Sequence, residues 1–215
     1  MANPIRVDIV SDVVCPWCIV GYSQLKRASE ETGIPLEIQW HPFELNPQMP
    51  SEGQNLREHI MEKYGSSAAD SQAARDRLTD LGADLGFTFA FTDDMRMVNT
   101  FRAHQLIHWA DEHGKGHAAK QALFTAYFTE RRDLNDPEVL ADVAESLGLS
   151  REEALKMLES ETLAQTVRQV EQFWLQQGIS GVPAMVFERQ NLVTGAQGEA
   201  NYANILRHLA EAPAA

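Results

Sequence analysis

The stretch VDIVSDVVCPWCIVG, residues 7–21, decides the fold of this chain. Residues 5–11 alternate and are rich in Ile and Val, which predicts a β-strand. Residues 15–31 then predict a helix, and residues 36–41 predict a second strand. This β-α-β order is the usual source of a parallel strand pair.

Working outward, residues 56–177 have an almost wholly helical pattern, in which only 87–97 is less clear and is interpreted as a surface loop. Strand signals return at 184–188 and 191–194, as in a hairpin, and a closing helix follows at 199–210. We therefore expect an α/β thioredoxin fold with a large all-helical insertion: a thioredoxin-like domain from residues 1–50 and 178–215, and an inserted helical domain from 51–177. The expected helices of the insertion are 56–64, 68–85, 99–113, 117–131, 137–147, 151–159 and 161–177.

The length and charge limit the classes of partner. A chain of 215 residues suits one large domain or a domain that carries an insertion. Its formal net charge of −13 opposes binding to nucleic acid and to anionic membrane surfaces. No apolar run is long enough for a transmembrane helix, and the N-terminus does not read as a secretory signal. We expect a cytoplasmic protein with no nucleic-acid or membrane partner.

The two cysteines of the chain, Cys15 and Cys18, lie three positions apart. A disulfide there closes a very small loop and stabilises the fold little, so a chemical role is the better explanation. Pro16 at the first helical position places Cys15 at the N-cap, where the helix dipole favours a thiolate. We therefore predict a lowered pKa for Cys15 as the nucleophile and a more buried Cys18 as the resolving thiol. Pro16 and Trp17 are expected to tune the potential and to contact the substrate.

Other interpretations of the cysteine pair stay open. Half of a zinc site would need two more ligands, and no further cysteine or paired histidine spacing supplies them, so we expect no metal. A chemically silent pair is the other alternative. His104 and His108 have helical spacing, but Gln105 stands where a zincin needs glutamate. A packed helix face is the simpler interpretation, and the alternative is that one of the two histidines lines the active-site groove.

Two residues outside the motif are further candidates. Asp12 lies three residues before Cys15, so it is either a turn residue or a proton relay during exchange. Pro183 precedes an expected strand, where it is either an ordinary strand-initiating proline or a cis proline. In the cis form it would expose the backbone of Val182 to an extended client chain.

The CPWC stretch, together with FELNP at 43–47, AHQLIH at 103–108, AYFTE at 126–130, GVPA at 181–184 and TGAQ at 194–197, resembles the DsbA-like family, specifically its FrnE-like cytoplasmic branch. The resemblance covers nearly the whole chain. It implies a thioredoxin fold with a helical insert and a cis Val182–Pro183 bond facing the cysteines. It also implies that Cys15 is the nucleophile, Cys18 the resolving thiol and Pro183 the substrate-side proline of a thiol–disulfide oxidoreductase or isomerase.

The same superfamily also contains 2-hydroxychromene-2-carboxylate isomerases and kappa-type glutathione transferases. These use glutathione and usually carry serine at the position of the nucleophilic cysteine, so a glutathione-dependent isomerase or transferase is the alternative function. A non-catalytic binding module is a third. We expect no bound cofactor, with client proteins or glutathione as redox partners, and consider a homodimer through the helical block. The direction of electron flow stays open.

Overall fold

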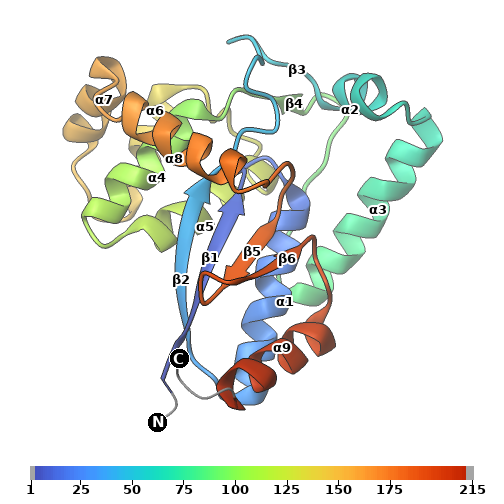
Figure 1. Ribbon diagram of the computed structural model, residues 1–215. Helices are drawn as coiled ribbons and strands as arrows, with labels where there is room; N and C mark the ends of the chain where they lie inside the picture. The colour runs from blue at the N-terminus through green and yellow to red at the C-terminus, as the bar shows by residue number, and fades with distance from the viewer. Residues whose placement is uncertain (1–2, 212–215) are drawn as a thin grey trace. The chain divides into compact units, whose positions relative to one another are not determined.

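Alternating β-branched residues build the central strand of the computed structural model, which describes residues 3–211. This strand, β1 (Ile5–Ser11), pairs parallel with β2 (Leu36–Pro42) and antiparallel with β5 (Ala184–Phe187). β6 (Asn191–Thr194) pairs antiparallel with β5, so the strand order is β2-β1-β5-β6 (Figure 1). The helix α1 (Pro16–Thr32) connects the two parallel strands. The predicted thioredoxin fold with a helical insertion is confirmed.

The two faces of this sheet carry different side chains. Ile9 and Met185 are paired across β1 and β5, and the Met185 side chain lies against α1 at Gly21. Neighbouring residues point the other way, where Val10 and Ala184 form a buried cluster with Trp174. The end of β1, which leads into the Cys-Pro-Trp-Cys motif, is therefore packed on both faces.

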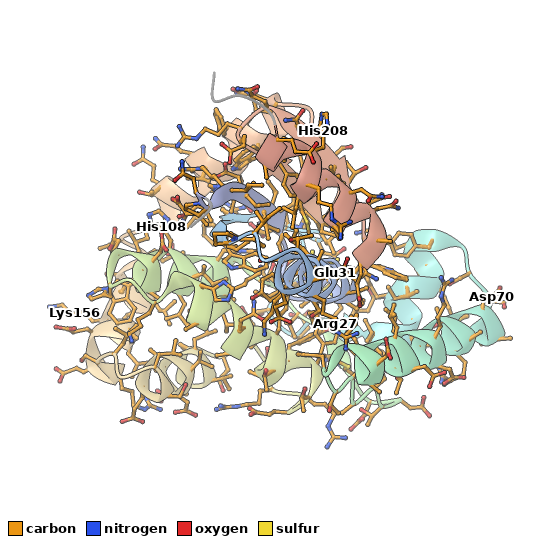
Figure 2. The ribbon with its side chains drawn as sticks, turned by 90° about the horizontal axis from the view of Figure 1, so that it is seen from below. Arg27, Glu31, Asp70, His108, Lys156 and His208 are labelled. Atoms are coloured by element: carbon orange, nitrogen blue, oxygen red, sulfur yellow. The ribbon has the colours of Figure 1, made fainter. Side chains whose placement is uncertain are left out.

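The closing helix α9 (Glu199–Glu211) packs along α1. Arg27 and Glu31 of α1, both labelled in Figure 2, form ion pairs with Glu199 and Arg207 of α9 at 3.1 Å and 2.7 Å. These pairs are half exposed, so they contribute little to stability. Their effect is to fix how α9 lies against α1, which positions the segment between β6 and α9.

The helical block follows the predicted order of helices. Asn55, Ser67, Asp136 and Ser150 each accept a backbone N–H at the start of a helix, which explains where four of the helices begin. The helices are α2 (Leu56–Tyr64), α3 (Ala68–Leu85), α4 (Phe101–Glu112), α5 (Gly116–Phe128), α6 (Pro137–Ser146), α7 (Arg151–Ser160) and α8 (Ala164–Gln176). Within the block α4 packs against α5, and α6 against α7.

The expected loop over residues 87–97 is confirmed for 87–95, which form neither helix nor strand, but the segment does not run only across the surface. Phe89 is buried and lies edge-on to Phe128 at 5.2 Å, so the segment is anchored in the core of the block. Its last residues form a short strand, β4 (Arg96–Met97), which pairs antiparallel with β3 (Gln54–Asn55). No local pattern predicts so short a pair, because its hydrogen bonds join segments about forty residues apart.

The helix predicted over 117–131 ends three residues earlier, at Phe128. The reason is in the backbone, since Arg131 adopts a φ of 60° and its neighbour Arg132 donates its N–H back to Ala126. A left-handed residue at this point closes the helix end.

The described part of the chain divides into two compact units, residues 3–45 with 170–211 and residues 46–169. The boundaries predicted from the sequence lie after residues 50 and 177, and the division into a thioredoxin-like domain and an inserted helical domain stays a prediction. Within residues 3–211, no helix combines the length and the apolar character that crossing a membrane requires.

Candidate active site

The turn between β1 and α1 positions both thiols. Cys15 is the N-cap residue of α1 with extended backbone angles, φ −94° and ψ 108°, and Pro16 occupies the first turn. The N–H of Cys15 donates to the backbone oxygen of Asp12 at 3.3 Å, and the N–H of Cys18 donates to the backbone oxygen of Cys15 at 3.1 Å. The motif therefore begins the helix where the sequence predicts.

Both thiols are reduced and buried. Cys15 is 4% exposed and Cys18 is fully covered. By contrast, Trp17, between them in the motif, is 39% exposed and is one of the large apolar side chains at the surface. An aromatic ring beside two shielded sulfurs offers an apolar contact to a molecule that approaches the thiols.

The segment before β5 completes the site from the other side. The Val182–Pro183 bond is cis, in agreement with the prediction. Because Ala184 pairs with Val10 near the end of β1, Val182 and Pro183 lie beside the start of α1. The Cys15 thiol donates its S–H to the backbone oxygen of Val182, with an S···O distance of 3.7 Å. The arrangement thus brings together Cys15, Cys18 and the Val182–Pro183 pair.

The predicted lowering of the pKa of Cys15 is wrong for this dithiol. The neighbouring thiol of Cys18 and burial raise the pKa of Cys15 well above its ordinary value, and the backbone N–H of Cys18 opposes this only in part. The N-cap position is real, but the Cys15 side chain accepts no capping hydrogen bond. Burial and the second thiol therefore favour the protonated form of Cys15, whose S–H is directed to the backbone oxygen of Val182.

Asp12 is fully buried, and its Oδ2 accepts the N–H of Leu45 at 2.7 Å. Its charge is one of the influences that raise the pKa of Cys15. The residue therefore serves the turn as a structural acceptor, and it also places a buried carboxylate in electrostatic reach of the nucleophile. A carboxylate in this position can exchange a proton with a thiol, directly or through water.

The two histidines of α4 belong to the other compact unit, that of residues 46–169. His104 is buried and His108 is half-buried; Figure 2 labels His108. Among residues 3–211, no group of three His, Cys, Asp or Glu side chains is placed to hold a metal ion. The packed-face interpretation is therefore consistent with the burial of His104.

Two residues near the thiols were not identified from the sequence. Gly21 lies one helical turn after Cys18 and faces Pro183, and Tyr202 of α9 is a buried phenol in electrostatic reach of Cys18. The TGAQ segment at 194–197, which carries part of the family resemblance, lies next to both in the fold. The TGAQ segment is therefore the sequence feature from which Gly21 and Tyr202 could have been identified.

A family model and a solved structure that match this chain both indicate the same protein family. The sequence model of the DSBA-like thioredoxin domain matches residues 6–207. A probable DsbA oxidoreductase from Streptomyces coelicolor is similar over 98% of this chain and 92% of its own, with 31% identity and a TM-score of 0.87.

Two more distant structures share the fold. A 2-hydroxychromene-2-carboxylate isomerase covers 97% of this chain and is itself covered completely, with 16% identity and a TM-score of 0.70. The cytosolic disulfide reductase DsbM from Pseudomonas aeruginosa, solved with glutathione, covers 95% of this chain with 98% of its own, at 18% identity and a TM-score of 0.63.

Proposed function

Because this chain belongs to the DSBA-like thioredoxin domain family, we propose that it is an enzyme that exchanges disulfides through Cys15 and Cys18. The observation that carries the proposal is the contact between the Cys15 thiol and the backbone oxygen of Val182, beside cis Pro183. A pair of thiols at a helix start, facing a strand end with open backbone groups, can hold an extended disulfide next to the nucleophile.

The exchange uses only groups of this chain and of the client. Cys15 loses its proton, with Asp12 as the proposed acceptor, and its sulfur attacks the client disulfide. A mixed disulfide forms, the client S–S bond breaks, and the first client sulfur leaves and takes up a proton. Cys18 then loses its proton and attacks Cys15, which releases the second client thiol and leaves the Cys15–Cys18 disulfide. The client gains two electrons and two protons, and the enzyme loses them.

We infer that electrons flow from the enzyme to the client. In a strongly oxidising couple, the reduced form is stabilised as a thiolate. Here burial, Cys18 and the hydrogen bond to Val182 favour the protonated thiol of Cys15. The reduced form therefore lacks the stabilisation that makes an oxidant, so a reductant is the better match. The shared fold of the cytosolic disulfide reductase DsbM is consistent with this direction.

We propose two kinds of client for the site, an extended protein chain and glutathione. The exposed ring of Trp17 and the backbone of Val182 suit the extended chain of a client protein, and the glutathione complex of DsbM makes glutathione a reasonable redox partner. We propose no tightly bound cofactor, and a place in the cytoplasm with the FrnE-like branch, where a reductant has a supply of electrons.

A glutathione-dependent isomerase is the second candidate, favoured by the TM-score of 0.70 with 2-hydroxychromene-2-carboxylate isomerase. The two thiols distinguish the candidates. An isomerase needs glutathione and a single polar group at position 15, whereas disulfide exchange needs both sulfurs.

The test compares wild type with Cys15→Ser and Cys18→Ser in the reduction of a peptide disulfide. Disulfide reduction should disappear in Cys15→Ser, while Cys18→Ser should accumulate a mixed disulfide that mass spectrometry detects. Disulfide reduction that persists in Cys15→Ser would refute the proposal. Activity that requires glutathione but neither cysteine would also refute it and would favour the isomerase.

A further inference from the structure

Tyr202 is a buried phenol on α9, within the same compact unit as the thiols. Its side chain is fully covered, and its hydroxyl donates to the backbone oxygen of Gly195 with an O···O distance of 3.0 Å. Gly195 lies in the turn between β6 and α9, where it adopts a φ of 76° that favours glycine. The phenol therefore fixes the first residue after β6.

Gly195 is in turn hydrogen-bonded to the segment that contacts the nucleophilic thiol. Its N–H donates to the backbone oxygen of Pro183 at 2.8 Å, and the preceding residue, Val182, accepts the S–H of Cys15 at 3.7 Å. Three hydrogen bonds thus connect the hydroxyl of Tyr202 with the nucleophilic sulfur. Between the Tyr202 hydroxyl and the Cys15 thiol only backbone groups take part, so the connection depends on where the turn is held.

The helix α1 holds the same turn from its other side. A Cβ atom at Gly21 would lie 3.2 Å from Cε of Met185, 3.4 Å from Cγ of Pro183 and 3.6 Å from Cα of Ala196. One turn along α1, Oε1 of Gln24 accepts the N–H of Gly198 at 2.9 Å. The segment from Gly195 to Gly198 is therefore set between α1 and the proline, with little room to shift.

We propose that Tyr202 is a positioning residue that holds the Val182–Pro183 backbone against Cys15, so that an extended disulfide client can pair with it. The inference rests on the proposed function, and it names a residue that neither the motif nor the mechanism above includes. A small disulfide that makes no backbone pairing needs only the thiols. Loss of the Tyr202 hydroxyl should therefore lower activity on extended clients and leave activity on small disulfides nearly unchanged.

The phenol is suited to a permanent donor role. Burial raises the pKa of Tyr202 to about 12, and the nearby sulfur of Cys18 acts in the same direction. The hydroxyl therefore keeps its proton, and with it the hydrogen bond to Gly195, at any pH at which thiol exchange is measured.

Tyr202→Phe removes the hydroxyl and keeps the ring. Tyr127→Phe is the matched control, since Tyr127 is 2% exposed and its hydroxyl also donates to a backbone oxygen, that of Arg96, at 2.9 Å in the other unit. A neutral hydrogen bond is worth up to about a factor of ten in an equilibrium. Hydrogen exchange of the Gly195 amide, followed by NMR, should therefore become roughly three- to tenfold faster in Tyr202→Phe and stay unchanged in Tyr127→Phe.

The second readout is activity on two substrates. In Tyr202→Phe, kcat/KM should fall about three- to tenfold for a linear peptide disulfide, mostly through KM, and stay within about twofold for hydroxyethyl disulfide. Equal losses on both substrates, or an unchanged exchange rate at Gly195, would overturn the inference. If the wild type reduces neither substrate, the proposed function fails, whereas the Gly195 exchange rate still decides whether Tyr202 holds the turn.

Discussion

Replacing Asp8 by asparagine should destabilise the unit that carries the thiols by about 3 kcal/mol at neutral pH, near the lower end of the range for breaking a buried ion pair. Asp8 lies in the middle of β1 and its side chain is only 3% exposed. Its Oδ1 accepts from Arg6 Nη2 at 2.8 Å and from His41 Nε2 at 2.8 Å, and its Oδ2 accepts from Arg6 Nε at 3.0 Å.

The magnitude follows from these three contacts. Asparagine can keep an oxygen at the Oδ1 position, but its NH₂ group would then face the Nε–H of Arg6, so one hydrogen bond is lost and the charge disappears. A hydrogen bond to a charged group contributes about 1.5–3 kcal/mol, and the two remaining bonds weaken because their acceptor has lost its charge. Arg6 is 31% exposed and can turn to solvent, which limits the total cost.

The pH dependence gives a second, independent check. Burial would raise the pKa of Asp8, but hydrogen bonds from Arg6 and His41 outweigh it and lower the pKa below its ordinary value of 3.8. A lowered pKa stabilises the folded state above the unfolded value, and this stabilisation is lost as the pH falls below it. The difference between wild type and Asp8→Asn should therefore be smaller at pH 3 than at pH 7.

Urea unfolding followed by tryptophan fluorescence is the appropriate assay, because Trp17, Trp40 and Trp174 all lie in the same unit as Asp8. With a slope of about 2 kcal/mol per molar urea, the midpoint should move down by roughly 1.5 M. Asp142→Asn is the control, since Asp142 also pairs with two basic side chains, those of Arg132 and Arg151, but is 43% exposed, and its loss should be much smaller. A loss below about 1 kcal/mol for Asp8→Asn, or an equal loss at pH 3, would refute the reasoning.

Three further changes test other parts of the structure. Oxidation of Cys15 and Cys18 should change the melting temperature by only a few degrees, because the loop is very small; a large rise in a calorimetric scan would contradict this. Gly82→Ala should cost about 3 kcal/mol in urea unfolding, since its Cβ would overlap the ring of Phe89 and lie 2.7 Å from the backbone oxygen of Phe87, and a neutral result would contradict this. Because the pKa of Tyr202 is raised from 10.0 to about 12, wild type should lose about 3 kcal/mol of stability relative to Tyr202→Phe between pH 10 and pH 12. If the stabilities of the two proteins instead change with pH in parallel, the raised pKa is contradicted.

Local patterns predicted most of the architecture. Residues 5–11 and 191–194 form strands as expected, because β-branched alternation and turn residues at both ends act locally. The position of Cys15 at the N-cap followed from Pro16 alone. The β3–β4 pair and the anchoring of Phe89 could not be predicted, since both depend on contacts with distant segments.

The chemistry of the site was less predictable than its location. The helix dipole predicts a thiolate at Cys15, but its pKa is set by burial and by Cys18, which depend on how the Val182–Pro183 segment covers the sulfur. Likewise Tyr202 lies 184 positions from Cys18, and no spacing rule relates them. The buried charge of Asp8 looks, from the sequence, like any polar residue in an alternating strand.

The reduction potential of the Cys15–Cys18 couple tests the central claim most directly. Equilibration in glutathione buffers, with the oxidised fraction followed by thiol alkylation and mass spectrometry, gives the value. The account predicts a potential near or below about −270 mV, in the range of thioredoxin, because the reduced form is not stabilised as a thiolate. A potential of about −200 mV or higher would contradict the proposed direction of electron flow. A pair that never forms a disulfide would contradict the dithiol mechanism itself.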